Sequence, residues 1–159
     1  MYNCFDIAKK FIELAKEEGV SMPPMKLLKL TYIAHGYYLG FTSKPLFSNE
    51  IQAWKFGPVI PDLYHIIRRY AQRSVDPEAV SIYSENELSK EDSKFINVIW
   101  NAYKRFDGLQ LSSSTHEEGS PWHNTYNNLH NRVIDNFTIE QYYKNFIDEK
   151  RRKRATATA

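Results

Sequence analysis

The sequence is poor in cysteine and glycine, because its 159 residues include one cysteine, Cys4, and six glycines. One cysteine cannot form a disulfide within the chain, which agrees with a reducing compartment, so we expect a cytoplasmic protein. The glycines form neither a GxGxxG nor a GxxxxGKS/T motif, and we expect no glycine-rich loop that binds phosphate. We also expect no secretion signal and no membrane contact, since no window approaches the roughly 20 apolar residues that span a bilayer.

An excess of positive charge is confined to the C-terminus. The formal net charge is +2, from 21 Lys and Arg and 19 Asp and Glu, but five of the basic residues are Lys150, Arg151, Arg152, Lys153 and Arg154. The other 16 basic residues stand against 19 acidic ones, which leaves residues 1–149 with a net charge of −3. We therefore expect nucleic acid to bind at most weakly, through the basic run. Residues 150–159 have nothing apolar to bury and are predicted to form a disordered basic tail.

The rest of the chain has the composition of a folded protein. Hydrophobic residues make up 42% of the sequence and aromatic residues 14%, enough for both a core and a contact surface. We predict a single domain over residues 1–149, because a chain of this length is too short for two ordinary cores.

Apolar periodicity predicts an α+β fold that is predominantly helical, with about six helices around a central buried helix and one small antiparallel β-sheet. The central helix is expected at 25–38, where apolar residues occur nearly all round the helix and Gly40 follows as the end signal. Alternating polarity predicts a strand over 50–56, and residues 80–83 are a candidate second strand. In the helix predicted at 89–106, the expected core face includes Val98 and Ile99. Further helices are predicted at 5–18, at 61–70, in two short segments between 109 and 126, and at 138–147.

Three histidines recur at intervals of seven residues, His116, His123 and His130. On a continuous helix this spacing separates the Cα atoms by about 10.5 Å, too far for a shared metal ion with bonds of about 2.1 Å. Gly119 and Pro121 break the helix, so the spacing does not exclude a site, but no HExxH or CxxC motif supports one. We predict no metal and no cofactor.

The candidate nucleophiles are Cys4 and the serines at 112–114, near His116 and Glu117. Their spacing does not assign a nucleophile, a base and an orienting group, and serines beside a short helix ordinarily act as caps. We predict no catalytic residue. A small hydrolase that uses His116 with Glu117 or Glu118 is the alternative.

The sequence around Gly57 and Pro58 predicts a rigid corner between the strand and the next helix, because glycine permits unusual backbone angles and proline fixes φ. This corner is a structural turn or part of a functional surface, and the sequence leaves both open. Trp122, just inside a helix start, fits a core position better than an exposed contact.

Three segments of the sequence are distinctive when taken together. They are Lys26-Leu27-Leu28-Lys29-Leu30-Thr31-Tyr32-Ile33-Ala34-His35-Gly36, then Pro45-Leu46-Phe47 with Ile51-Gln52-Ala53-Trp54-Lys55-Phe56-Gly57-Pro58-Val59-Ile60-Pro61-Asp62-Leu63-Tyr64, and Leu111-Ser112 with Thr115-His116 and Pro121-Trp122. In this order and spacing they resemble one family, the phage-associated SocA/Panacea antitoxin domain, over about residues 3 to 147. The middle segment, with an Ala-Trp-Lys strand that leads into Gly-Pro-Val and a Leu-Tyr helix, is the most specific.

This resemblance implies an antitoxin that neutralises a co-encoded protein toxin by direct binding, or an adaptor that delivers the toxin to a protease. A DNA-binding regulator is a further alternative, against which the negative charge of residues 1–149 counts. Whether the chain forms a homo-oligomer is left open. The candidate partner-binding residues are Tyr37, Tyr38, Trp54, Tyr64, His116 and Trp122, and the residues assigned to the structural motif are Gly57, Pro58, Val59, Thr115 and Pro121.

Overall fold

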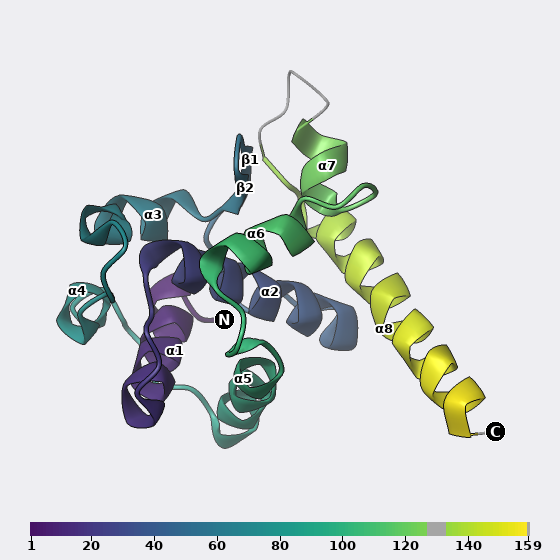
Figure 1. Cartoon of the computed structure of the whole chain (residues 1–159), viewed down its shortest axis with the longest axis horizontal. Helices are drawn as coiled ribbons and strands as arrows, with labels where there is room; N and C mark the ends of the chain where they lie inside the picture. Colours follow the sequence, from purple (N-terminus) through teal and green to yellow (C-terminus); the bar gives the residue numbers. More distant parts are fainter. Residues whose placement is uncertain (127–132, 159) are drawn as a thin grey trace.

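The computed structural model describes residues 1–126 and 133–158, and it confirms a mostly helical α+β fold (Figure 1). The described residues form eight α-helices, a short 3-10 helix and one two-stranded antiparallel sheet. In chain order the elements are α1 (Cys4–Glu18), α2 (Pro24–Thr42), β1 (Gln52–Trp54), β2 (Gly57–Val59), α3 (Pro61–Ile67), the 3-10 helix η1 (Arg68–Tyr70), α4 (Pro77–Ser81), α5 (Lys90–Tyr103), α6 (Gly108–Thr115), α7 (Pro121–Tyr126) and α8 (Asn136–Thr158). No described helix combines the length and apolarity that a membrane-spanning segment requires.

Helix α2 is the centre of the fold, as its all-round apolar pattern predicts. It contacts α1, α3, α5, α6, α8 and the strand β2, and it is buried along nearly its whole length. The predicted end at Gly40 is wrong, because α2 continues to Thr42 and ends on Ser43 in a left-handed conformation. A helix surrounded on all sides by other elements presents no single polar face, so its ends are set by its neighbours as much as by local signals.

Two glycines of α2 allow α8 to pack closely against it. A Cβ atom added at Gly36 would lie 2.2 Å from the Tyr143 ring, and one added at Gly40 would lie 2.8 Å from Ile147 Cδ1. The two glycines are four residues apart and therefore lie on one face of α2. The missing side chains leave space for the buried Tyr143 of α8.

The sheet is a hairpin, and its second strand lies elsewhere than predicted. Strand β1 pairs with β2 in the register Gln52↔Val59, Ala53↔Pro58 and Trp54↔Gly57. The Gly57-Pro58 step is therefore part of the second strand, and the turn consists of the two residues before it. Proline fits this position because a two-stranded hairpin leaves edge positions that require no N–H donor.

The predicted strand at 80–83 is wrong. Residues Pro77–Ser81 form helix α4, with Asp76 as the N-cap that accepts a hydrogen bond from the Glu78 N–H. An N-cap aspartate followed by proline at the first helical position was the signal for this helix. The β-branched residues after it do not outweigh that signal.

The core face of α5 is rotated relative to the prediction. Ile96, Ile99 and Trp100 are buried, whereas Val98 is 65% exposed. Apolar residues occur on two adjacent faces of this helix, so its periodicity could not assign the buried face without the neighbouring helices.

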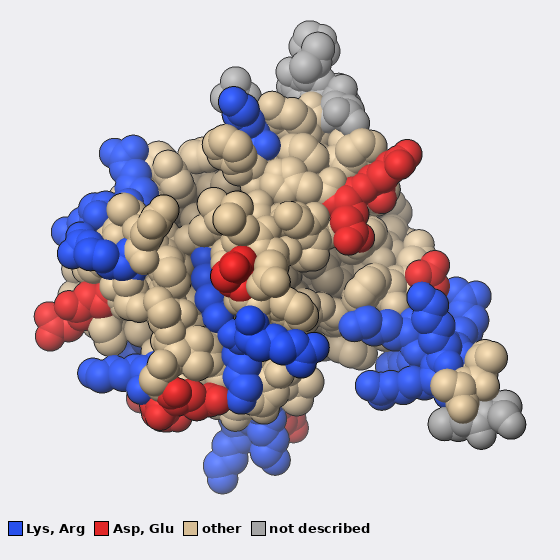
Figure 2. Space-filling model, in the orientation of Figure 1, with Lys and Arg blue, Asp and Glu red and all other residues tan. Residues whose placement is uncertain are grey.

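The prediction of a disordered tail is corrected by α8, which starts at Asn136 instead of Thr138 and continues through the basic run to Thr158. The run consists of good helix formers without proline or glycine, and cations near a helix C-terminus are favourable. Lys150 lies 4.7 Å from the centre of the Phe146 ring, and Arg151 lies 5.9 Å from that of Phe41. Figure 2 shows the resulting group of Lys and Arg side chains on the projecting end of α8.

A buried carboxylate, Asp6, ties α1 to the segment before α5. It is 3% exposed and accepts hydrogen bonds from the Asn3 N–H, the Ser84 hydroxyl and the N–H groups of Glu85 and Asn86. Burial by itself raises the pKa of Asp6, but these hydrogen bonds outweigh it and hold the pKa below its ordinary value. The charged form therefore stabilises the fold at neutral pH, and this contribution is lost as the pH falls below about 4.

Asp6→Asn should lower the free energy of unfolding by about 2 kcal/mol at pH 7, because an amide cannot accept all four hydrogen bonds. Urea denaturation measures this loss, and Glu13→Gln on the exposed side of α1 is the matched control. Equal stability of the two variants would contradict the role assigned to Asp6.

Candidate functional site

The hairpin is anchored to the rest of the fold by Lys29 of α2. Its ammonium group is buried and donates a hydrogen bond of 2.8 Å to the Pro58 carbonyl, and burial lowers the pKa of Lys29 to about 8. Gly57, at φ +120°, is the close-approach point, because a Cβ atom there would lie 2.9 Å from both Lys29 Nζ and His116 Cε1. Gly57 is thus required both for its backbone conformation and for the space it leaves.

The C-terminal turn of α6 holds the hairpin from the other side. The Ser112 hydroxyl donates a hydrogen bond of 2.8 Å to the Phe56 carbonyl. The His116 ring contacts the Ser112 carbonyl through Nδ1 at 2.5 Å and packs edge-on to Trp122 at 4.3 Å between ring centres. The turn of the hairpin is therefore fixed to α6 and, through Trp122, to α7.

Aromatic side chains gather where β1, α3 and α7 meet. Trp54 packs edge-on to Tyr64 with 5.0 Å between ring centres, and Trp122 stacks on Tyr126 at 4.8 Å. The Trp122 indole N–H donates a hydrogen bond of 2.6 Å to the Trp54 carbonyl and joins the two pairs. We call Trp54, Phe56, Tyr64, Trp122 and Tyr126 the hairpin surface.

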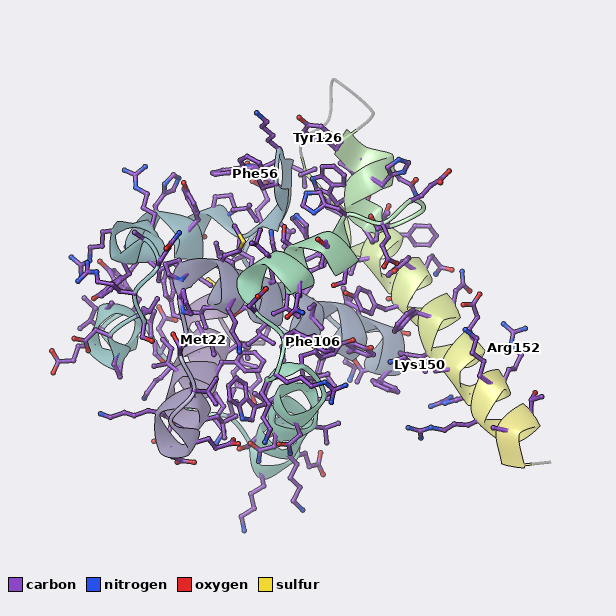
Figure 3. All side chains as sticks on the ribbon, viewed as in Figure 1. Met22, Phe56, Phe106, Tyr126, Lys150 and Arg152 are labelled. Atoms are coloured by element: carbon purple, nitrogen blue, oxygen red, sulfur yellow. The ribbon has the colours of Figure 1, made fainter. Side chains whose placement is uncertain are left out.

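The hairpin surface presents apolar area to solvent. Phe56 is 65% exposed and Tyr126 is 41% exposed, while the two tryptophans and Tyr64 are half-buried. Figure 3 labels Phe56 and Tyr126, which lie at the same end of the molecule on the hairpin and on α7. Half-buried aromatic residues around exposed ones are typical of protein-binding sites.

Four of the six predicted partner-binding residues lie at or next to this surface: Trp54, Tyr64 and Trp122 belong to it, and His116 supports it. Tyr37 and Tyr38 lie elsewhere on α2. Tyr37 is buried and pairs through its hydroxyl with the Tyr103 hydroxyl at 2.6 Å, and Tyr38 packs against Phe95. These two tyrosines are not part of the hairpin surface.

The remaining motif residues hold the surface in place. Val59 is buried in β2, and the buried Thr115 donates through its hydroxyl to the Ser112 carbonyl at 2.8 Å. Pro121 is the first residue of α7, and the Ser120 hydroxyl before it caps the helix by accepting a hydrogen bond from the His123 N–H.

Among the residues considered for catalysis, Ser112 and His116 come close together, with 3.4 Å between Ser112 Oγ and His116 Nδ1, but both groups have other, shorter polar contacts. His116 Nδ1 faces a backbone carbonyl, and Ser112 uses its hydroxyl on the Phe56 carbonyl. Cys4 is buried, and burial raises the pKa of its thiol. Glu117 is exposed to solvent, and the residues that the structure describes contain no group of three or more metal-binding side chains. His130, the third of the spaced histidines, lies outside the described residues.

Sequence reasoning did not identify Phe56 and Tyr126 as site residues. Phe56 was assigned to the end of a strand, where the burial of an aromatic residue is expected, and Tyr126 had no motif around it. The available signal was the turn itself, because an aromatic residue at a hairpin turn has little core to enter.

Comparisons with known proteins relate the chain to an antitoxin family. The family model "Antitoxin SocA-like, Panacea domain" matches residues 27–123, which include most of α2, the hairpin, α6 and the start of α7. The chain is also 26% identical over 125 residues to "Antitoxin SocA" of Caulobacter vibrioides (strain NA1000 / CB15N). That match covers 73% of this chain and 66% of the relative's length. The search of solved structures found no match.

Proposed function

Because the chain belongs to the SocA-like Panacea family of antitoxins, we propose that it neutralises a protein toxin encoded beside it by binding that toxin directly. The observation that carries the proposal is the hairpin surface, which combines exposed and half-buried aromatic rings and of which all but Tyr126 lie inside the matched segment. Large aromatic side chains contribute much of the binding energy at protein interfaces.

The anchoring of the hairpin supports a binding role. Its backbone is held by Lys29 from α2 and by Ser112 from α6, so the aromatic rings are held in position before any partner arrives. A preorganised surface loses less conformational entropy on association than a flexible one.

Phe56→Ser and Tyr126→Ser should each weaken toxin binding about tenfold or more and reduce growth rescue, because each removes exposed aromatic area. Ile82→Ser is the matched control, since Ile82 is 74% exposed but lies at the end of α4, away from the hairpin. The measurements are growth upon co-expression with the adjacent gene product and affinity by calorimetry. Thermal unfolding of each variant shows whether the fold is intact.

Two results would overturn the proposal. The first is an adjacent gene product that is harmless when it is expressed alone. The second is full neutralisation by the double variant Phe56→Ser and Tyr126→Ser at wild-type abundance.

The same co-expression separates blocking from delivery to a protease. If the protein acts by occupancy, the amount of toxin in the cell stays constant or rises when the antitoxin is present. A fall in toxin amount that requires a cellular protease would assign the adaptor mechanism instead.

A further inference from the structure

A second candidate site, this one concave, lies beside the segment that joins α6 to α7. It is a cleft with a volume of about 530 Å³, bounded by α2, the end of α5, α6, the start of α7 and α8. Thr115, Glu117 and Pro121 line it, whereas His116 and Trp122 in the same segment contact the hairpin. The cleft and the hairpin surface are therefore distinct. Its volume is in the range of sites that hold a small ligand or a protein side chain.

Aromatic rings form much of the wall of the cleft. Six rings line it, one from α2, two from the end of α5 and the α5–α6 connection, and three from α8, and several of them meet edge to face. They are Tyr32, Tyr103, Phe106, Tyr142, Tyr143 and Phe146. Aromatic faces attract cations through the ring quadrupole, and Arg guanidinium groups stack on them.

The cleft is lined by one charged side chain among the described residues, and that side chain is acidic. It is Glu117, and no described Lys, Arg or His is a lining residue. Burial, and then the Glu117 carboxylate, raise the pKa of Tyr142, which also lines the cleft, so Glu117 influences the aromatic wall. The other polar lining groups, such as Ser113 and Gln110, are neutral.

The chain itself shows that these rings accept cations. Lys150 lies 4.7 Å from the centre of the Phe146 ring, and Arg105 lies 4.9 Å from that of Phe106. Neither cation is a lining residue of the cleft. Figure 3 labels Phe106 at the α5–α6 connection and Lys150 on α8.

We propose that this cleft is a second binding site, which receives an arginine side chain of a partner polypeptide. The guanidinium stacks on the aromatic walls and donates hydrogen bonds to the Glu117 carboxylate, and the apolar stem of the arginine contacts the rings. Arginine fits better than lysine, because its planar group can stack on a ring and bind a carboxylate at once. Arginine binding at this cleft is expected whichever toxin the hairpin surface binds.

The test uses the full chain and three probes: a capped Gly-Arg-Gly peptide, the same peptide with neutral citrulline in place of arginine, and free arginine. Amide and aromatic chemical shifts locate the site and give the dissociation constant. We expect the Arg peptide to shift signals of Tyr142, Phe146 and Ser113, and to bind about five- to tenfold more tightly than the citrulline peptide. Free arginine should bind more weakly than the capped peptide, because its charged α-amino and α-carboxylate groups, which replace neutral amides, cost more to remove from water beside an aromatic wall.

Glu117→Gln should weaken the Arg peptide about five- to tenfold and leave the citrulline peptide unchanged. Glu118→Gln is the matched control, because Glu118 is the adjacent exposed carboxylate and does not line the cleft. Equal binding of the Arg and citrulline peptides, shifts confined to another surface, or equal losses in the two variants would overturn the proposal. Tighter binding of free arginine would assign the cleft to a small cation instead of a polypeptide. These results are independent of toxin neutralisation, so either proposal can fail alone.

Discussion

Gly36→Ala should lower the free energy of unfolding by about 3 kcal/mol, even though alanine is the better helix former by about 1 kcal/mol. The added Cβ atom would lie 2.2 Å from a carbon of the Tyr143 ring, and that ring is buried between α2 and α8. The ring cannot turn aside in a packed interior, so α8 must move away from α2. Urea denaturation followed by circular dichroism measures the change.

The control is the same substitution in a protein that carries Tyr143→Ala. Without the ring, Gly36→Ala should become neutral or stabilising, because the helix propensity of alanine then dominates. Gly40→Ala should cost less than Gly36→Ala, since its Cβ atom would first meet the flexible end of Ile147. If Gly36→Ala is equally destabilising with and without Tyr143, the contact described between α2 and α8 does not explain the glycine.

Acid should destabilise the protein through His35, by about 3 kcal/mol between pH 7.5 and pH 4. His35 is fully buried, and burial lowers its pKa from 6.5 to about 4, against a smaller opposing effect of the hydrogen bond from the ring to Asn136. Between these pH values the unfolded chain binds a proton that the folded chain does not, so the free energy of unfolding falls as the pH falls. Above about pH 7.5 the ring is neutral in both states and the contribution is constant.

His35→Gln tests this directly, because glutamine can hydrogen-bond to Asn136 but does not titrate. The variant should lose about 3 kcal/mol of the pH dependence in urea denaturation between pH 7.5 and pH 4. Asn136→Ala, which removes the hydrogen bond and keeps the imidazole, should retain that pH dependence. A variant with His35→Gln whose pH dependence equals that of the wild type would refute the assignment.

The two proposed sites share one structural support. Ser112 and His116 of α6 hold the hairpin, and Thr115 and Glu117 of the same segment line the aromatic cleft. Variants at the exposed positions Phe56 and Glu117 therefore separate the two sites, because neither side chain holds the shared segment in place. Variants of Ser112 or Thr115 would disturb both.

The fold was predicted well where the signal is local. Gly19 ends α1 in the left-handed conformation, Ser89 caps α5 through the Asp92 N–H, and both boundaries follow from one or two residues. The hairpin was predicted only in part. Its second strand is three residues long, too short for an alternating pattern, and one of the three is a proline. Helix α4 was missed because β-branched residues at its end were given more weight than its Asp-Pro start.

The candidate site shows the same division. Trp54, Tyr64 and Trp122 were identified by their motifs, but the sequence could not distinguish them from Tyr37 and Tyr38, which are equally aromatic. Tyr37 is buried because α5 and α8 cover it, and Phe56 is exposed because the hairpin turn extends beyond its neighbours. Exposure depends on what packs against a residue, and that information is not local.

The sequence by itself determined the helix-rich composition of this protein, its central apolar helix, its caps and the family to which it is similar, because each of these depends on residue type and short spacing. The tertiary structure alone decided that Gly36 makes space for Tyr143 and that an aromatic cleft forms beside the hairpin surface. These features arise between segments up to about a hundred residues apart in the chain, and contacts of that range depend on how the helices pack, which no periodicity within one helix can specify.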